Sequence, residues 1–284
     1  MYVDLHMHTT ESDGRLSPTE LVDLAASRDL RIIAVTDHDT TEGLEEAYEA
    51  AKKHPQMTII PGIELSTDIP GHEIHILGYF LEYSDPKFQE VLREFRALRY
   101  DRGRRMVDNL RKLGVYITWE RVLEIAGGGT GSVGRPHIAQ AMVEGGYIRE
   151  VKEAFDRYIG RDGPAFADRA KLSPQEAIEM IKRVGGVAVW AHPRDVFPEV
   201  EAILDDIVPA GLAGMEAFYH GYDGEVHEHL RRLCREHDLV PCGGSDFHGI
   251  SGNPEAGLGN IDVPMETAER LFALKGQPLP TGVA

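Results

Sequence analysis

Histidine side chains that could bind a metal ion open this chain, which has 284 residues and 13 histidines. His6 and His8 are two positions apart, and residues i and i+2 of an extended segment face the same side, so both imidazoles can reach one ion. The pair is weak evidence by itself. A second pair of this kind, His227 and His229, lies in a helical pattern and is predicted to be a solvated surface pair.

The position of further histidines and carboxylates strengthens the first pair. Six histidines and three carboxylates lie in predicted strands, at their ends or in the loops that follow: His6, His8, Asp13, His38, Glu64, His75, His192, Asp246 and His248. The carboxyl ends of the strands of a (β/α) barrel meet at one mouth, where catalytic groups gather. Nitrogen and oxygen ligands without thiolate suit Mn²⁺, Zn²⁺ or Fe²⁺.

The elements that must position these residues alternate between strand and helix patterns. Buried-strand patterns are predicted at residues 2–5, 31–36, 57–65, 72–81, 187–191, 213–218 and 239–242. Ser17 and Ser173 each begin a Ser-Pro-x-Glu capping box, which predicts a helix start. Seven strands, most of them followed by helices, indicate an α/β fold, a (β/α) barrel with one unit missing.

The middle of the chain has a different pattern. Asp85 and Pro86 form an N-cap and first turn, and apolar residues with helical spacing follow as far as Leu113. The prediction is a helical insertion, a substrate cap, over residues 85–165. The barrel is predicted to comprise residues 1–84 and 166–284.

The insertion also concentrates basic residues. Arg99 and Arg102, at i and i+3 of the long helix, could share a phosphate, and Arg135 stands where a helix N-terminus favours anions. A solvated basic face is the alternative for any one arginine, and capping is at least as plausible as function for His137. Arg194 and His220 are further candidates for phosphate contact.

Charge and composition exclude several classes of protein. The formal net charge is −17, which argues against a broad basic face for duplex nucleic acid. No apolar run approaches the ~20 residues of a membrane span. The absence of a signal-peptide pattern, with Cys234 and Cys242 as the two cysteines, predicts a cytoplasmic protein with free thiols. No pattern indicates an obligate protein partner.

Several motifs together resemble the PHP (polymerase and histidinol phosphatase) family: DLHMHTTESDG at 4–14, TDHDT at 36–40, PGIELS at 61–66, His75, AHP at 191–193 and GSDFH at 244–248. The resemblance implies a distorted (β/α)7 barrel with two or three divalent metal ions. It assigns one ion to His6, His8, Glu64 and Asp246, and a second to Glu64, His75 and His192. It assigns a third to Asp13, His38 and His248.

The resemblance further implies a metal-dependent phosphoesterase in which Glu64, Asp246 and His248 support catalysis. Two ions that share Glu64 would activate water by lowering its pKa towards ~7. The insertion resembles the branch that hydrolyses nucleoside 3′,5′-bisphosphates and trims short oligonucleotides from the 5′ end, so a small phosphorylated substrate is expected.

Other functions stay open as alternatives. Histidinol phosphatase is the first, although the basic insertion fits a nucleotide better. A metal-dependent amidohydrolase would normally use a bridging lysine where Glu64 stands. An inactive or polymerase-accessory module is disfavoured by the complete ligand set, and 284 residues leave no room for a polymerase.

Overall fold

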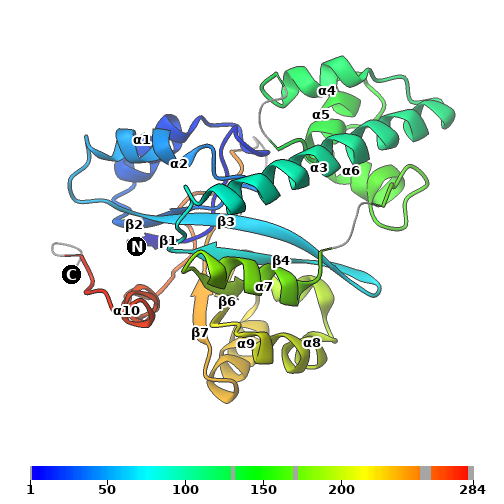
Figure 1. Ribbon diagram of the computed structural model, residues 1–284. Coiled ribbons are helices and arrows are strands. Elements are labelled where there is room, and N and C mark those ends of the chain that lie inside the picture. Colours follow the sequence, from blue (N-terminus) through cyan, green and yellow to red (C-terminus); the bar gives the residue numbers. More distant parts are fainter. Residues whose placement is uncertain (1, 129–131, 169–171, 250–256, 281–284) are drawn as a thin grey trace.

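The fold is built on one sheet of seven strands, which lie in chain order and curl into a nearly closed barrel (Figure 1). The computed structural model describes residues 2–128, 132–168, 172–249 and 257–280. The strands are β1 (Val3–Asp4), β2 (Ile32–Val35), β3 (Thr58–Ile69), β4 (His72–Tyr79), β5 (Val187–Trp190), β6 (Gly214–Phe218) and β7 (Val240–Gly243). The predicted α/β fold, a distorted (β/α)7 barrel, is therefore confirmed.

One strand, β4, departs from the regular alternation of parallel strands and helices that the sequence suggested. β4 is antiparallel to both β3 and β5, and no helix separates β3 from β4. The physical reason is the connection: Pro70 and Gly71, with φ at +86° for Gly71, form a turn too short for a parallel crossover. His75 therefore does not follow a strand end, and it reaches the mouth because it pairs with Ser66, two residues beyond Glu64.

The barrel closes at its mouth through an isolated bridge. β1 and β7 are the two ends of the sheet, and Met7 forms a parallel bridge with Phe247 just beyond them. The His8 amide donates to the Phe247 carbonyl over 2.9 Å. On the same edge Asp4 accepts from the amides of Ser245 and Gly259, each over 2.9 Å. These contacts join β1 and the segment after it to the segment after β7, beside His6 and His8.

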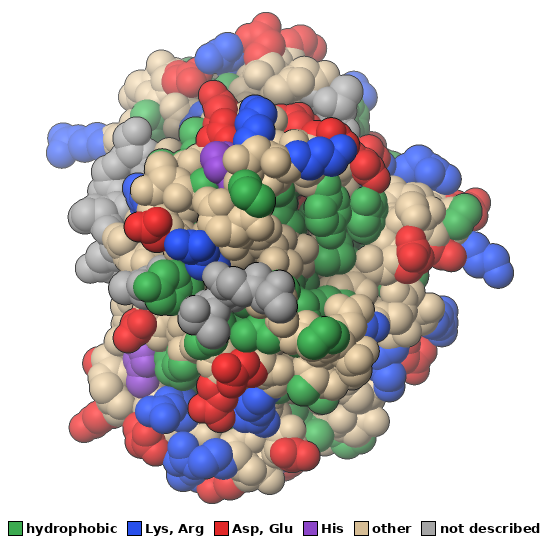
Figure 2. All heavy atoms as spheres, turned by 90° about the vertical axis from the view of Figure 1, so that its left-hand side faces the viewer, with side chains coloured by type: hydrophobic (Ala, Val, Ile, Leu, Met, Phe, Trp, Pro, Cys, Tyr) green, Lys and Arg blue, Asp and Glu red, His purple; other side chains and the backbone are tan. Residues whose placement is uncertain are grey.

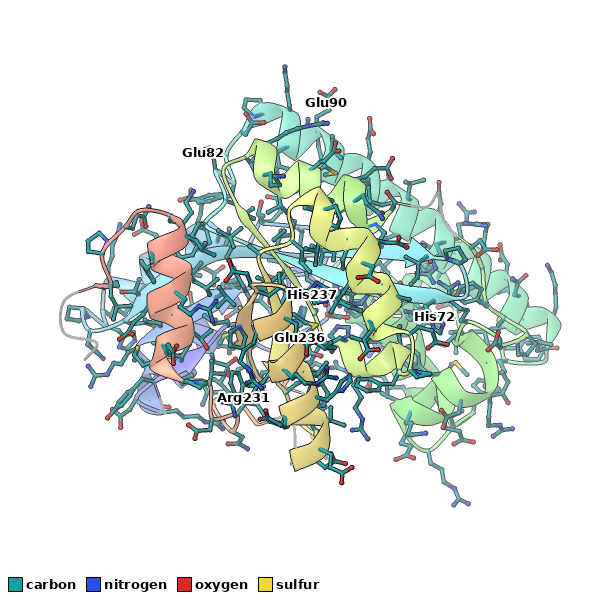
Figure 3. The ribbon with its side chains drawn as sticks, turned by 90° about the horizontal axis from the view of Figure 1, so that it is seen from below. His72, Glu82, Glu90, Arg231, Glu236 and His237 are labelled. Atoms are coloured by element: carbon teal, nitrogen blue, oxygen red, sulfur yellow. The ribbon has the colours of Figure 1, made fainter. Side chains whose placement is uncertain are left out.

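Helices surround the barrel, and several of them lie side by side in the view from below (Figure 3). They are α1 (Pro18–Ser27), α2 (Leu44–Ala51), α7 (Pro174–Arg183), α8 (Val200–Ile207), α9 (Gly224–Glu236) and α10 (Met265–Leu274). Both predicted capping boxes are present, with Ser17 before α1 and Ser173 before α7. Figure 3 also labels His72 at the far turn of the β3–β4 hairpin.

The middle of the chain is helical and has its own apolar core. It contains α3 (Pro86–Lys112), α4 (Trp119–Ile125), α5 (Arg135–Glu144), α6 (Val151–Ala154) and a π-helical turn (Phe155–Ile159). Phe88 and Leu92, near the start of α3, pack into the barrel core, whereas Met106 and Leu110 pack into the core of the insertion. One long helix is therefore shared by both parts and carries the insertion across the mouth (Figure 1).

One face of the molecule shows how its charged side chains are distributed. On the face shown in Figure 2, acidic and basic side chains are interspersed. No described helix is long and apolar enough to cross a lipid bilayer. The thiols of Cys234 and Cys242 are free and buried.

Candidate metal centre and substrate cleft

The first group of candidate ligands joins the two ends of the barrel. His6 and His8 follow β1, Glu64 lies in β3 and Asp246 follows β7, and their ligand atoms lie within 4.8 Å of one another. His6 Nε2 is 3.2 Å from Glu64 Oε2 and 3.3 Å from Asp246 Oδ1. His8 Nε2 is 3.3 Å and 3.0 Å from the same two oxygens. One position in space is thus faced by two imidazoles and two carboxylates.

A second group surrounds Asp13, in the loop after β1. Asp13, His8, His38 and His248 bring their ligand atoms within 4.8 Å of one another. His248 Nε2 is 3.3 Å from Asp13 Oδ1, and His38 Nε2 is 3.8 Å from Asp13 Oδ2. His8 belongs to both groups, because its Nε2 faces Asp246 while its Nδ1 lies 3.8 Å from Asp13.

Glu64 lies at the centre of the third group. Its Oε1 is 2.7 Å from His75 Nδ1 and 3.1 Å from His192 Nε2, and its Oε2 is 3.1 Å from His38 Nδ1. The grouping differs from the expected one, since His38 joins Glu64 and His75 within 4.8 Å. The reason is a parallel bridge between His38 and Glu64 that sets His38 directly beside the carboxylate.

The donor set fits divalent metal ions. Within the part of the chain that the structure describes, four buried ligand atoms have no hydrogen-bond partner: His6 Nε2, His38 Nδ1, Asp13 Oδ1 and Glu64 Oε2. A buried polar atom without a partner is costly, and cations held by the three ligand groups would satisfy these atoms. Imidazole nitrogens and carboxylate oxygens are ligands that transition-metal ions accept.

Strong coupling between these groups shifts their pKa values. Burial favours the neutral form of Glu64, but His38, His6 and His75 hold the pKa of its carboxyl well below the ordinary value. Burial lowers the pKa of His38 to about 3, so this imidazole is neutral at pH 7. Although burial opposes its charge, Asp13 and Asp246 raise the pKa of His248 to about 10. This raised pKa favours the protonated imidazole of His248 near neutral pH, so binding of a metal ion through this ring would displace a proton.

We expect metal binding to release protons near neutral pH. His248, with its pKa raised to about 10, would have to lose its proton to act as a ligand, so about one proton or more per chain should appear. Titration of the chelator-treated protein with metal in weakly buffered solution, followed by a pH-stat, measures this number. His248→Ala should reduce it by about one, and binding without proton release would contradict the assignment of His248 as a ligand.

Sequence reasoning missed a buried carboxylate behind the ligands. Glu216, in β6, is fully buried; its Oε1 is 3.1 Å from His6 Nδ1, and its Oε2 accepts from the His192 amide over 2.8 Å. It therefore fixes the ring of His6 with Nε2 towards Glu64. It also holds His192, whose φ of +30° is uncommon for a side-chain-bearing residue. The available signal was a charge inside the apolar run of residues 213–218.

Replacing Glu216 with glutamine should weaken metal binding. The amide group turns a donor towards either His6 Nδ1 or the His192 amide, so one ligand loses its support. Loss of an outer partner typically costs about 10- to 100-fold in metal affinity. Competition with a coloured chelator gives the affinity, and thermal unfolding of the metal-free protein serves as the control for folding. An unchanged affinity would show that Glu216 is only a core residue.

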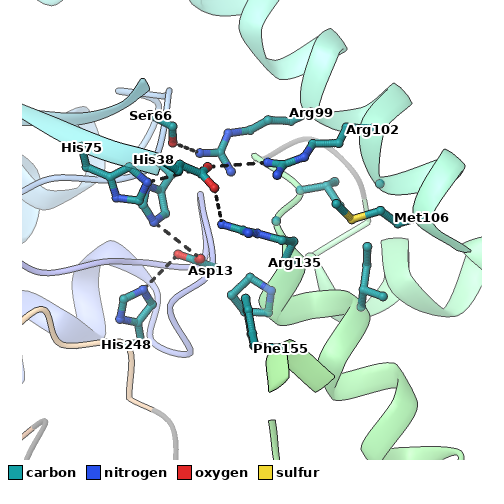
Figure 4. Close-up of a pocket in the computed structure, with 16 residues that line it drawn as sticks. Asp13, His38, Ser66, His75, Arg99, Arg102, Met106, Arg135, Phe155 and His248 are labelled. Carbon is teal, nitrogen blue, oxygen red and sulfur yellow. Dashed lines mark hydrogen bonds and ion pairs between the residues drawn. The ribbon is translucent and has the colours of Figure 1, made fainter. Parts of the chain in front are cut away.

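The cleft of about 180 Å³ lies between the barrel mouth and the insertion. Its walls come from the barrel residues Asp13, His38, Ser66, Glu73, His75 and His248 and from the insertion residues Arg99, Arg102, Gly103, Met106, Val133, Gly134, Arg135, Pro136, Ile138 and Phe155. Figure 4 shows three arginine side chains from the insertion reaching towards His38, His75 and Asp13. The cleft therefore has candidate metal ligands on one side and guanidinium groups on the other.

Arg99 has a different role from the one its spacing suggested. It is buried, its Nε donates to Asp39 Oδ2 and its Nη2 donates to Ser66 Oγ, both over 2.5 Å. Two of its three nitrogens are therefore used in anchoring α3 to the barrel. Arg99 and Arg102 both line the cleft, but a phosphate shared by them would compete with these contacts of Arg99.

Arg102 and Arg135 are held in the cleft by a carboxylate that sequence reasoning did not single out. Glu73 Oε2 accepts from Arg135 Nη2 over 2.7 Å, and Glu73 Oε1 is 3.7 Å from Arg102 Nη1 (Figure 4). Arg135 also stacks over Phe155, with 5.5 Å between the guanidinium carbon and the ring centroid. Although burial favours its neutral form, Arg135, His75 and Arg102 keep the pKa of Glu73 well below its usual value. Arg102 and Arg135 carry two positive charges and Glu73 carries one negative charge, so this side of the cleft has a net positive charge.

The remaining two substrate candidates lie elsewhere. Arg194 and His220 are not among the residues that line the cleft. The exposed Arg194 side chain donates to the Gly221 carbonyl, and the His220 ring stacks on Tyr219 with centroids 4.3 Å apart. His137, in contrast, accepts from the Gly134 amide over 3.0 Å, which is a capping contact.

Comparison with known proteins agrees with this architecture. The PHP domain family model matches residues 4–161. A 5′-3′ exoribonuclease of Haemophilus influenzae is 36% identical over 263 residues, covering 92% of this chain and 94% of that protein. A 3′,5′-nucleoside bisphosphate phosphatase of Chromobacterium violaceum is 31% identical, covering 87% of this chain and 87% of that protein.

A solved structure gives the same result at the level of the fold. A Bifidobacterium adolescentis protein assigned as a metal-dependent phosphoesterase superposes with a TM-score of 0.87 at 31% identity, covering 99% of this chain and 98% of that one. The donor set at the barrel mouth fits divalent metal ions. The chain is therefore a metal-dependent phosphoesterase, a hydrolase of phosphoric ester bonds, and it belongs to the PHP-domain family.

Proposed function

We propose that the protein hydrolyses the 3′-phosphate of nucleoside 3′,5′-bisphosphates and removes nucleotides from the 5′ end of short oligonucleotides. The observation that carries the proposal is the arrangement of the cleft around β4. Glu73 of this strand contacts Arg135 of the insertion, and His75 of the same strand contacts the candidate ligand Glu64. A substrate with two phosphate groups can reach the ligand cluster with one of them and the arginines with the other. The exoribonuclease and bisphosphate phosphatase relatives support the same chemistry.

The proposed ligand assignment follows the geometry. His6, His8, Glu64 and Asp246 would hold one ion, and His8, Asp13, His38 and His248 another. Glu64, with His75, His192 and His38, would hold a third. When bound, ions such as Mn²⁺, Zn²⁺ or Fe²⁺ supply Lewis-acid activation of water and offset phosphate charge. We assign the supporting roles in catalysis to Glu64, Asp246 and His248.

The chain's own residues orient the substrate. Arg102 and Arg135 offer charge-assisted hydrogen bonds to the second phosphate. Phe155 and Met106 form an apolar wall beside them, against which a nucleoside can lie. We propose that residues 85–165 act as a cap that excludes water from the cleft, and that the enzyme works in the cytoplasm.

Histidinol phosphate is the rival substrate, and it lacks a second anionic group for Arg135. The discriminating experiment combines elemental analysis with a phosphate-release screen over a nucleoside 3′,5′-bisphosphate, a nucleoside 3′-monophosphate and histidinol phosphate. We expect two or three transition-metal ions per chain and the highest kcat/KM for the bisphosphate. A higher kcat/KM for histidinol phosphate would overturn the proposed substrate class, and metal-independent hydrolysis would contradict the metal assignment.

A further inference from the structure

A set of aromatic rings lies near the mouth but outside the cleft. Tyr219, His220, Tyr222 and His227 follow β6, and we call them the aromatic strip. Tyr219 stacks on His220 with centroids 4.3 Å apart and lies 5.3 Å from Tyr222, whose ring meets His227 edge-on at 5.7 Å. All four side chains are half-buried, so part of each reaches solvent.

The aromatic strip begins at the candidate metal centre. The Tyr219 hydroxyl donates to Asp246 Oδ2 over 2.6 Å, and the Tyr219 ring lies 5.7 Å from the ring of His192. The cleft is lined by residues that follow β1, β2 and β7, by residues of β3 and β4, and by the insertion. The aromatic strip follows β6, next to His192 at the end of β5. The candidate ligands therefore contact two surfaces of different chemistry, one with guanidinium groups and one with aromatic rings.

Arg194 adds a positive charge beside the rings. Its amide donates to the Tyr222 hydroxyl over 3.3 Å, and its guanidinium donates to the Gly221 carbonyl within the same loop. Asp223 and Glu225 lie at the start of α9, next in the chain. This surface therefore has little net positive charge, and binding there must rely on stacking more than on charge.

We propose that the aromatic strip binds the bases on the 3′ side of the scissile bond when the substrate is a short single-stranded oligonucleotide. This inference rests on the exonuclease part of the proposed function. Every base has a π-face, so stacking on tyrosine and histidine rings holds single strands without selecting a sequence. A nucleoside bisphosphate ends at the phosphate that reaches the ligands and does not extend to the strip. The strip therefore distinguishes an oligonucleotide from a bisphosphate.

The test compares two substrates in Tyr222→Ala. The ratio of kcat/KM for a 5′-phosphorylated trinucleotide to that for a nucleoside 3′,5′-bisphosphate should fall about tenfold, because one stacking platform is lost. Tyr222→Phe keeps the aromatic ring, so this variant should have the same ratio as the original protein. Tyr116→Ala, which removes a tyrosine that is 68% exposed and does not line the cleft, is the matched control and should leave the ratio unchanged.

A binding measurement separates the strip from turnover. Fluorescence anisotropy of a dye-labelled trinucleotide in chelator should show a Kd about tenfold higher for Tyr222→Ala than for the original protein. For the original protein, a plot of the logarithm of the association constant against the logarithm of the salt concentration should have a slope near −0.7, as expected for about one phosphate contact. An equal loss on both substrates would make the strip merely structural and overturn the inference. Bisphosphate turnover without any trinucleotide turnover would also overturn it and leave bisphosphate hydrolysis standing, whereas no turnover of either would remove the proposed function itself.

Discussion

Glu64→Gln is expected to lose more than about 100-fold in turnover while the barrel still folds. Glu64 contacts His75 and His192 through one oxygen and His38 through the other, so a single amide must replace two anionic ligand atoms. Substitution of an outer partner already costs about 10- to 100-fold, and a central ligand should cost more. Phosphate release on the bisphosphate and elemental analysis of the variant measure both losses.

Asp13→Asn provides the comparison for Glu64→Gln. Asp13 belongs to the group with His8, His38 and His248 and not to the group with His6 and Asp246. We expect this variant to lose part of its metal and to retain the rest, whereas Glu64→Gln should weaken every group that contains Glu64. Circular dichroism confirms that each variant is folded. Full activity with full metal content in Glu64→Gln would show that Glu64 is not a bridging ligand.

Arg135→Ala should reduce kcat/KM for the bisphosphate by about 10- to 150-fold. That range corresponds to the loss of a charge-assisted hydrogen bond of ~1.5–3 kcal/mol. The loss should be much smaller for a phosphomonoester that has one phosphate group, because that substrate does not extend to the arginine wall. Steady-state kinetics on both substrates gives the two losses, and metal content should not change since arginine is not a ligand.

Arg104→Ala is the matched control for Arg135→Ala. Arg104 lies on α3 but is exposed and does not line the cleft. A solvated basic face predicts the same small effect at both positions. Arg99 is a poor choice for this comparison, because its contacts with Asp39 and Ser66 anchor α3 and its loss would displace the whole wall. If Arg135→Ala and Arg104→Ala had the same kcat/KM for the bisphosphate, histidinol phosphate would become the favoured substrate.

The barrel and its ring of polar residues could be predicted from the sequence because both depend on local rules. His6 and His8 share a side of an extended segment, and Asp246 follows a buried strand, so their placement at one mouth needs only strand periodicity and the barrel rule. Ser17 and Ser173 likewise mark helix starts through contacts made within four residues.

Features that depend on distant contacts could not be predicted in this way. The direction of β4 depends on the two-residue turn and on pairing with β5, far along the chain. The partner of Arg99 is Asp39, 60 residues away, and spacing along one helix carries no information about it. Arg194 follows a predicted ligand in sequence, but its side chain turns to Gly221 instead of the cleft.

The short closure between β1 and β7 suggests that the proposed metal ions would also have a structural role. A two-residue strand such as β1 has few backbone hydrogen bonds to offer, and the Met7–Phe247 bridge stands beside the site. His6 and His8 belong to one side of that gap, and Asp246 and His248 to the other. An ion bound by residues from both sides would link them, so the proposed metal ligands would also connect the segments that follow the first and last strands. Metal binding at this place would then stabilise the closed barrel, and a change that separates β1 from β7 would also weaken metal binding.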